Sequence, residues 1–394
     1  MPNNKKVAAI ICEYNPFHNG HKYHIDQTKN QTGADYVMCI MSGSMVQRGQ
    51  IAITDKWQRA KIAVQNGADL VVELPAVNVL QSADNFAFGA VELLHAIGVV
   101  DFLSFGSETG DVEPLCHIAN ILNNPPDVFT NTLKEQMDIG IGYPAAVEAA
   151  LSQCGVKDKL NPNDILAVNY IKALMQLKSG IKPVAVLRTN SYHSNLPSGD
   201  VASATAVRNM LKNGEDISSF VPQIPTDIYD ESRLESLVIG FFRLADAGSL
   251  RHIAGMEEGL AERMIKSAKQ STCLEQFVSG CVTKRYTAHR IRRVIMCSIL
   301  GIKKGTKANY LRILASNQNG FQIISQIKQN THIPIVTKFA DFDTQCNSAA
   351  MIDILATDVA SICSSVPQNR IASRDYTTSP QIVNHNPTKN SRFS

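Results

Sequence analysis

The chain has 394 residues, of which 44 % are hydrophobic, and this length and composition predict a globular protein of two or three domains. No stretch reaches the roughly eighteen consecutive apolar residues that a membrane-spanning helix needs. The polar start from Met1 to Lys6 lacks the apolar core of a secretion signal, so we expect a cytoplasmic protein. Nine cysteines without a Cys-x-x-Cys pair favour reduced thiols and argue against a zinc site.

The formal net charge of +3 hides an uneven distribution of charge along the chain. Residues 276–340 contain eleven Lys or Arg and no Asp or Glu, whereas the remainder contains 27 basic and 35 acidic residues, a balance of −8. A strongly basic segment in an otherwise acidic chain predicts that a polyanion binds there.

Five short apolar segments predict buried strands, and segments with helical spacing lie between them. Thr54 and Ser82 are candidate helix caps in these intervening segments. Strands that alternate with helices predict βαβ units and an α/β, Rossmann-like domain with a parallel sheet. We expect this domain to span residues 1–210, with a helical insertion at about 107–181. The predicted strands are Lys6–Cys12, Tyr36–Met41, Asp69–Leu74, Val99–Phe105 and Lys182–Arg188.

Beyond residue 210 the strand signals fade and helical spacing recurs. This spacing predicts an α-helical domain over 211–375, which contains the basic segment. Residues 376–394 are rich in Ser, Thr, Asn and Pro and predict a disordered tail. The predicted helices are Leu234–Ala245, Gly255–Ser267, Leu274–Cys281, His289–Leu300 and Gly320–Lys328.

The most informative motif, Asn15-Pro16-Phe17-His18-Asn19-Gly20-His21, follows the first predicted strand. A helix that begins here offers unpaired N–H groups and a partial positive charge to an anion, and Gly20 lets a ligand approach the backbone. His18 and His21 can donate hydrogen bonds to phosphate oxygens and stabilise charge as pyrophosphate leaves. The alternative is a pair of surface histidines, but the position at the carboxyl edge of a parallel sheet favours a nucleotide site.

A strand followed by an aromatic residue, Asn or Asp, Pro and His-x-Gly-His is similar to the signature of the nucleotidyltransferases related to class I aminoacyl-tRNA synthetases. Further motifs resemble the tRNA(Met) cytidine acetate ligase family over roughly residues 5–345. They are CEYNPFHNGH from Cys12, GSMVQRG at 43–49, DKWQRA at 55–60, NGADLVVELP at 66–75, SFGSE at 104–108 and KRYT at 284–287.

This resemblance implies an enzyme that forms acetyl-adenylate from ATP and acetate and transfers the acetyl group to N4 of the wobble cytidine of elongator tRNA(Met). It implies ATP as a substrate, together with Mg²⁺, and acetate and tRNA as partners. No residue is assigned to a metal, and the metal requirement and the oligomeric state stay open. Catalytic roles fall on His18 and His21. The implied ATP contacts are Val7, Ala8, Ala9, Ile10, Ile11, Cys12, Glu13, Tyr14, Asn15, Pro16, Phe17, His18, Asn19, Gly20, Gly106, Asn163 and Arg188.

Residues 202–208 are similar to a second motif of the same superfamily, Ile-Ser-Ser-Thr-x-x-Arg, which holds phosphates. Ser203, Thr205 and Arg208 are therefore candidate phosphate contacts. Alanine replaces one serine of the motif, so a helix merely capped by Ser203 is the alternative. Gln47 and Arg48, after the second strand, could orient the carboxylate of a small acid.

The basic segment supplies candidate tRNA contacts: Lys284, Arg285, Tyr286, Arg290, Arg292 and Arg293. Lysine and arginine neutralise phosphates, and Tyr286 could stack on a base. The alternative is a solvated basic helix face.

Two other functions compete with the acetate ligase. A nucleotidyltransferase that adenylates a small phosphorylated substrate would explain the first motif but not the basic segment. A non-catalytic RNA-binding protein would not need both His18 and His21.

Overall fold

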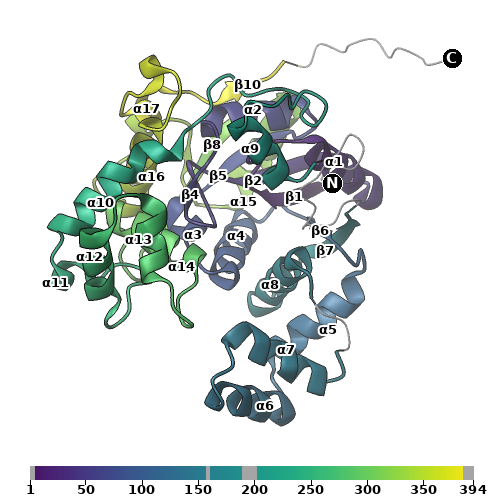
Figure 1. The fold of residues 1–394 in the computed structure, drawn as a ribbon. Helices are drawn as coiled ribbons and strands as arrows, with labels where there is room; N and C mark the ends of the chain where they lie inside the picture. The colour runs from purple at the N-terminus through teal and green to yellow at the C-terminus, as the bar shows by residue number, and fades with distance from the viewer. Residues whose placement is uncertain (1–4, 157–159, 189–201, 385–394) are drawn as a thin grey trace.

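The computed structural model describes residues 5–156, 160–188 and 202–384 (Figure 1). Its centre is an eight-stranded sheet in the order β10-β8-β5-β2-β1-β6-β7, with β9 beside β8. The five predicted strands are confirmed and pair in parallel. They are β1 Val7–Cys12, β2 Tyr36–Ser42, β5 Leu70–Leu74, β6 Phe102–Ser107 and β7 Lys182–Leu187.

Helices connect these strands and cover the sheet. Helix α1, Asn19–Thr32, ends at Gly33, and α4, Ala83–Ile97, ends at Gly98; both glycines have a left-handed backbone. The cap of α2, Lys56–Gln65, is Asp55 and not Thr54, because the Asp55 carboxylate accepts from the Gln58 N–H while the Thr54 hydroxyl bonds the Gln58 side chain. The short helix α3 spans Ala76–Val79, and β3, Met45–Val46, pairs with β4, Gln50–Ile51.

The segment between β6 and β7 forms a helical lobe below the sheet in Figure 1. The Lys172 ammonium bonds the Asp84 carboxylate at 2.9 Å and ties this lobe to α4. Its helices are α5 Val112–Asn123, α6 Asp127–Asp138, α7 Tyr143–Gln153 and α8 Pro162–Gln176.

After β7 the chain is mainly helical, as predicted, but not entirely. Leu311–Ser316 forms β8, which pairs antiparallel with β5. The short strand β9, Ile335–Val336, pairs in parallel with β8. The prediction of a purely helical region over 211–375 is therefore wrong at β8. The strand was hidden because Arg312 interrupts its apolar pattern, and the buried ion pair of Arg312 with Asp375 cannot be read from local sequence.

The helices from α10, Glu235–Leu244, to α14, Ala288–Ile299, group beside the sheet in Figure 1, whereas α15, Gln318–Asn330, packs on β2, β5 and β8. Helix α14 corresponds to the predicted helix His289–Leu300 shifted by one residue towards the N-terminus, and α13, Leu274–Cys281, has the predicted bounds. The helices are α9 Ala204–Lys212, α10 Glu235–Leu244, α11 Ala247–Leu250, α12 Leu260–Gln270, α13 Leu274–Cys281, α14 Ala288–Ile299, α15 Gln318–Asn330, α16 Ser348–Ser361 and α17 Arg374–Thr377, with one-turn helices at Glu231–Leu234, Phe339–Asp341 and Pro367–Asn369.

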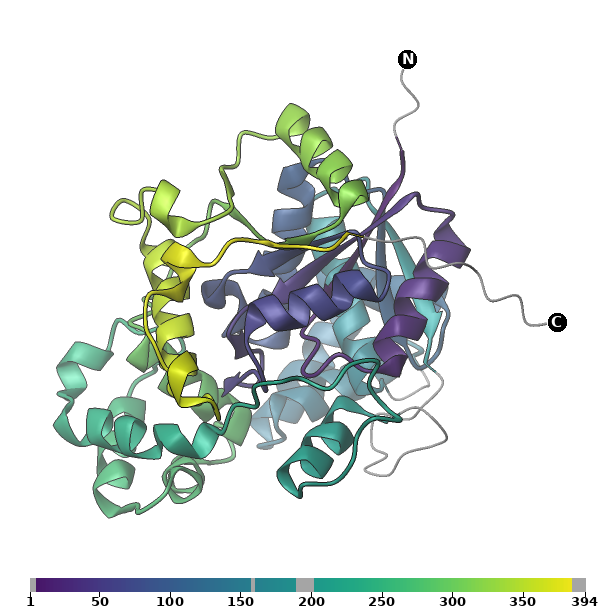
Figure 2. The ribbon, with the colours of Figure 1, turned by 90° about the horizontal axis from the view of Figure 1, so that it is seen from above.

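Part of the segment expected to be a disordered tail belongs to the fold. Gln381–Ile382 forms β10, which pairs with β8, and the yellow chain in Figure 2 crosses the molecule to reach the sheet. Residues 385–394 of the predicted tail lie outside the described residues.

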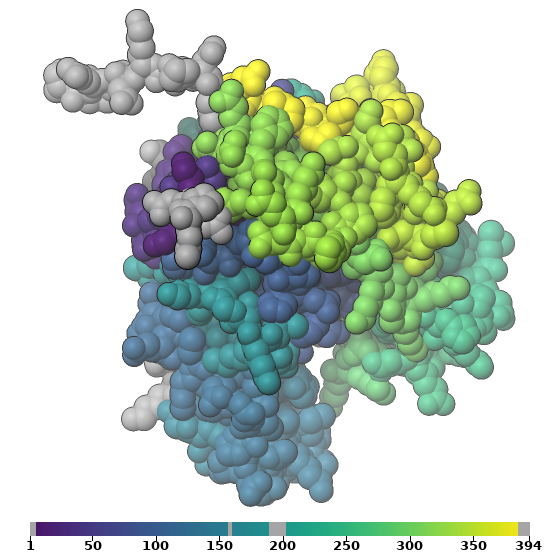
Figure 3. Space-filling view, turned by 180° about the vertical axis from the view of Figure 1, so that it is seen from behind, coloured from purple at the N-terminus to yellow at the C-terminus, as the bar shows by residue number. Residues whose placement is uncertain are grey.

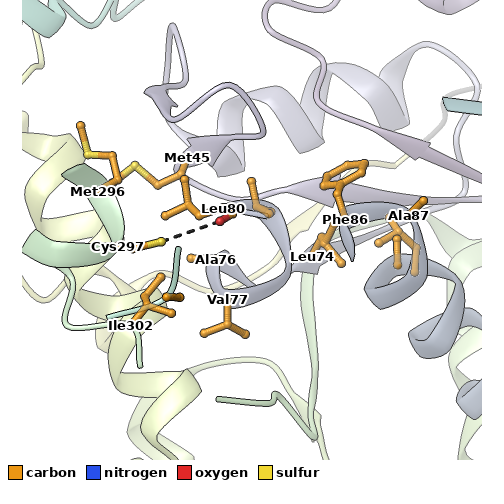
Figure 4. Packing of buried hydrophobic residues seen from close by; sticks show 14 of the residues in the cluster. Met45, Leu74, Ala76, Val77, Leu80, Phe86, Ala87, Met296, Cys297 and Ile302 are labelled. Atoms are coloured by element: carbon orange, nitrogen blue, oxygen red, sulfur yellow. Dashed lines mark hydrogen bonds between the residues drawn. The ribbon is translucent and has the colours of Figure 1, made fainter. Parts of the chain in front are cut away.

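The helical region and the sheet share one hydrophobic core. Met296 and Cys297 of α14 pack beside Leu80 and Met45, and the Cys297 thiol donates to the Leu80 carbonyl at 3.7 Å (Figure 4). The two regions therefore form a continuous body rather than two separately cored domains. Within the described chain, no helix combines the length and apolar character needed to cross a bilayer.

Candidate active site

A tightly held turn follows β1. Tyr14 adopts a left-handed backbone (φ 48°), and its buried ring lies 4.8 Å from the Phe17 ring and 4.9 Å from the His21 ring. Its hydroxyl is 3.2 Å from the Cys39 sulfur. The Asn15 carbonyl accepts from Arg208 of α9 at 2.7 Å. These contacts fix the direction in which the chain enters α1.

The two histidines of the motif cap α1 together. The Gly20 N–H donates to His18 Nδ1 at 3.1 Å, and the His18 N–H donates to His21 Nδ1 at 3.2 Å. The rings stack, with centroids 3.6 Å apart. Because each Nδ1 accepts a hydrogen bond, the hydrogen of each neutral ring lies on Nε2. Both rings therefore have an Nε2–H available as a donor.

Burial keeps these rings neutral. Desolvation, reinforced by the charges of Arg188 and Arg208, lowers the pKa of His18 to about 3. Desolvation and the charge of Arg188 lower the pKa of His24 to about 4, and the pKa of His21 is also lowered, mainly by burial. Neutral donors stabilise anionic charge without the cost of burying a further cation.

We expect these histidines to make the fold sensitive to acid. Their folded pKa values lie below the unfolded value of 6.5, so stability is full above about pH 6.5 and falls as the pH drops towards 4. Each ring contributes a slope of about 1.4 kcal/mol per pH unit in that window. Urea unfolding of His24→Gln between about pH 4.5 and 6 should show a slope shallower than wild type by that amount, and parallel curves would contradict the assignment.

A cavity of about 350 Å³ opens at the carboxyl ends of β1, β6 and β7. The strand order reverses between β1 and β6, and such switch points are where open α/β sheets bind ligands. Arg48, Arg188, Arg208 and the three histidines line it, and Glu13 is the one carboxylate among the described lining residues. The cavity is therefore suited to an anion.

Arg188 lies at the end of β7 against Gly106 of β6. A Cβ on Gly106 would lie 3.3 Å from Arg188 Cγ, so the glycine makes room for this side chain. Arg188 Nε is buried and has no hydrogen-bond partner among the described residues. Buried unpaired donors are rare, and a phosphate oxygen would satisfy this one.

Most of the predicted ligand contacts meet at this cavity. Asn163 of α8 lines it with its amide nitrogen held by the Glu108 carboxylate, and Ser203 caps α9 through the Ala206 N–H. The described lining contains these predicted residues: Ile10, Ile11, Cys12, Glu13, Tyr14, Asn15, His18, His21, Gly106, Asn163, Arg188, Ser203, Thr205 and Arg208.

Other predicted contacts lie elsewhere. Val7, Ala8 and Ala9 are fully buried inside the sheet, and Pro16, Phe17, Asn19 and Gly20 are not part of the lining. The N–H groups that start α1 are also not free, because Asn19 N–H donates to the Phe220 carbonyl and Gly20 N–H to His18. The imidazoles and guanidiniums, rather than helix amides, are thus the donors that face the cavity.

Two contributors were missed from sequence. His24 lines the cavity and bonds the Ser104 hydroxyl at 3.0 Å; its spacing of three residues from His21 was the available signal. Arg59 is fully buried and donates to the carbonyls of Glu13, Ser42 and Gly43, so it joins the turns after β1 and β2. No local pattern reveals a buried arginine of this kind.

The basic segment is more heavily paired than its sequence implies. Arg285 and Arg290 both bond Glu257, and Arg292 bonds Glu231. Tyr286 is only 7 % exposed, with its ring against Arg285 and Arg290, so the structure does not offer it to a base. Lys284 and Arg285 remain exposed, and Arg293 contacts the Gln47 carbonyl beside the cavity.

Comparisons with known proteins identify the family of this chain. The family model described as HIGH Nucleotidyl Transferase matches residues 5–375. A tRNA(Met) cytidine acetate ligase of Acetivibrio thermocellus is 36 % identical over 94 % of this chain and 98 % of its own, and one of Clostridium kluyveri is 35 % identical over 96 % and 99 %. The crystal structure of Thermotoga maritima TmcAL bound with alpha-thio ATP has a TM-score of 0.85 at 31 % identity and covers 96 % of this chain and 100 % of that one. The chain therefore belongs to the HIGH nucleotidyl transferase family and, within it, to the tRNA(Met) cytidine acetate ligases.

Proposed function

We propose that this protein uses ATP to activate acetate and transfers the acetyl group to N4 of the wobble cytidine of elongator tRNA(Met). The observation that carries the proposal is the stacked His18–His21 pair, with both rings lining a cavity that also contains Arg188 and Arg208. This group of donors fits a triphosphate. We infer the acid and the acceptor from the family to which the chain belongs.

In the first step, an acetate oxygen attacks the α-phosphorus and the bond to the bridging oxygen of pyrophosphate breaks. The Nε2–H groups of His18 and His21 would bond the oxygens on which charge develops, and Arg188 would bind a phosphate. Gln47 and Arg48 line the same cavity and are the candidates to orient acetate. No covalent nucleophile is required, because alignment and charge stabilisation are sufficient.

Mg²⁺ carried by the triphosphate fits this lining. Protein sites for nucleotide-bound Mg²⁺ usually supply one or two carboxylates, and Glu13 is available at the end of β1. Bound there, the ion would neutralise phosphate charge. Glu13 is itself oriented by the Gln47 N–H, which donates to its carboxylate at 2.7 Å.

In the second step, the cytidine N4 attacks the acetyl carbon, the bond from that carbon to the AMP oxygen breaks, and N4 loses a proton. The turn containing Gln47, Arg48 and Gly49 lies between the cavity and α14. The acceptor base would therefore approach the adenylate past this turn, from the side of the basic segment.

Replacing Arg188 by alanine should weaken ATP binding by roughly 10- to 100-fold, because a hydrogen bond to a charged group contributes about 1.5–3 kcal/mol. Arg188→Lys should recover only part of the loss, since lysine cannot reproduce the planar guanidinium. Titration calorimetry with a non-hydrolysable ATP analogue measures the effect, and Arg233→Ala, at an exposed pair outside the cavity, is the control. If Arg188→Ala binds the ATP analogue with wild-type affinity, Arg188 does not contact ATP.

The activation step is tested by exchange of labelled pyrophosphate into ATP without tRNA. We expect exchange that depends on acetate. Exchange that occurs instead only with a small phosphorylated substrate would replace the acetate proposal by the simple nucleotidyltransferase.

A further inference from the structure

A second cavity, of about 940 Å³, lies between the helical insertion and the basic segment. One wall is the stretch from the end of α6 to the start of α7, and the opposite wall is formed by residues before and within α14. Its base is the start of α4, around Gln81 and Ser82. Viewed from behind, the blue insertion and the green helices project as separate masses on either side of this region (Figure 3). We call this cavity the interlobe groove.

The charged residues described in the lining of the interlobe groove are all basic. Lys284, Arg285, Arg290 and Arg293 line it, and no Asp or Glu is among its described lining residues. Glu257, outside the lining, pairs with Arg285 and Arg290, but a guanidinium has five N–H donors, so donors remain for a second anion. This wall therefore fits a polyanion.

The opposite wall is apolar and exposed. Tyr143, at the first position of α7, is 61 % exposed, and Met137 and Ile141 beside it are also exposed. A tyrosine ring in such a place is a stacking platform for a flat aromatic group. Phosphate-binding cations facing an exposed aromatic ring favour unpaired nucleotides over a duplex, whose bases are not free to stack.

The interlobe groove adjoins the active-site cavity. Ala83 and Phe86 line the cavity, whereas Ser82 and Asn85 line the groove, so the two hollows lie on either side of the first turn of α4. Gly49 packs so closely on α14 that a Cβ would lie 2.4 Å from the Arg293 nitrogen. The turn that contains Gln47 and Arg48, which line the active-site cavity, therefore packs against α14 in the basic wall of the groove.

We propose that the interlobe groove binds unpaired nucleotides of the tRNA anticodon loop, with phosphates on Lys284 and Arg285 and a base stacked on Tyr143. Nucleotides held there place the neighbouring target base at the entrance of the active-site cavity. The choice of tRNA as the RNA rests on the proposed function, whereas the groove chemistry rests on the residues described above.

The test is direct binding of an unmodified tRNA(Met) transcript to the full chain, followed by fluorescence anisotropy without ATP or acetate. Tyr143→Ala should weaken binding by roughly 5- to 100-fold, and Tyr143→Phe should bind within about twofold of wild type because it keeps the ring. Phe321→Ala, an exposed aromatic on α15, is the matched control and should bind like wild type. Lys284→Gln should reduce the slope of log affinity against log salt by about one.

Acetate-dependent pyrophosphate exchange by Tyr143→Ala should equal that of wild type, because the ring lies outside the active-site cavity. Wild-type affinity of Tyr143→Ala for the transcript, or no binding by the wild-type protein, overturns the groove proposal. Binding that depends on Tyr143 in a protein without acetate-dependent exchange supports the groove and refutes the proposed function instead.

Discussion

Replacing His21 by alanine is expected to lower acetate-dependent pyrophosphate exchange by about 10²- to 10³-fold, the loss typical of removing one donor to a developing charge. The ring stacks on His18 and its Nδ1 accepts from the backbone of His18, so its Nε2–H is the group that can reach the phosphates. The loss should appear in the rate of exchange at saturating ATP, because this hydrogen bond strengthens as pyrophosphate leaves.

The structural role of this pair can be separated from its chemical role. Asparagine is a good helix cap, so His18→Asn should keep an acceptor for the Gly20 N–H while its shorter side chain loses the reach of Nε2. We expect His18→Asn to keep a melting temperature close to that of wild type and to lose activity to a similar extent as His21→Ala. If His18→Asn exchanges pyrophosphate at the wild-type rate, these imidazoles serve only to cap α1.

Replacing Lys56 by methionine should destabilise the fold by about 3–5 kcal/mol, the usual cost of leaving buried charges unpaired. Lys56 is fully buried, and its ammonium lies 2.8 Å from the Glu73 carboxylate and 2.9 Å from that of Asp375. Burial alone would lower the pKa of Lys56, but the two carboxylates outweigh it and raise the pKa overall. Without the ammonium, Glu73 would lose its ion pair, and Asp375 would keep the longer contact with Arg312 at 3.5 Å.

The Lys56 cluster also connects distant parts of the chain. Asp375 comes from α17 and Glu73 from β5, and Gly43 beside Glu73 has no room for a side chain, since a Cβ would lie 2.0 Å from the carboxylate oxygen.

Urea unfolding of Lys56→Met measures the loss of stability. Lys172→Met is the matched control, because the Lys172–Asp84 pair is partly exposed and should contribute less than about 1 kcal/mol. Equal effects of the two substitutions would contradict this account of the cluster.

The sequence was sufficient for the parallel strands from β1 to β7 and for the position of the His-x-Gly-His motif at the start of α1. The strands between Val7 and Leu187 are predominantly apolar, and the His-x-Gly-His motif follows the turn after the first of them, so local pattern and position point to the same fold. Gly106, Asn163 and Arg188 come from three other elements, and they were assigned through the family resemblance rather than through any local pattern.

What the sequence could not show depends on contacts between distant residues. The strand containing Arg312 is stable because Asp375, far along the chain, neutralises its charge. Tyr286 was a candidate for base stacking because it lies among basic residues, yet it is buried against them, whereas Tyr143 lies exposed across the interlobe groove. Exposure depends on how the insertion and α14 face each other, which no spacing rule predicts.

The most direct test of the central claim is incorporation of radiolabelled acetate into tRNA by the purified protein, with and without ATP. The account predicts label that requires ATP, releases AMP in equal amount and is recovered as N4-acetylcytidine at the wobble position of elongator tRNA(Met). Label that appears without ATP, or AMP release with no acetylated nucleoside, would contradict it.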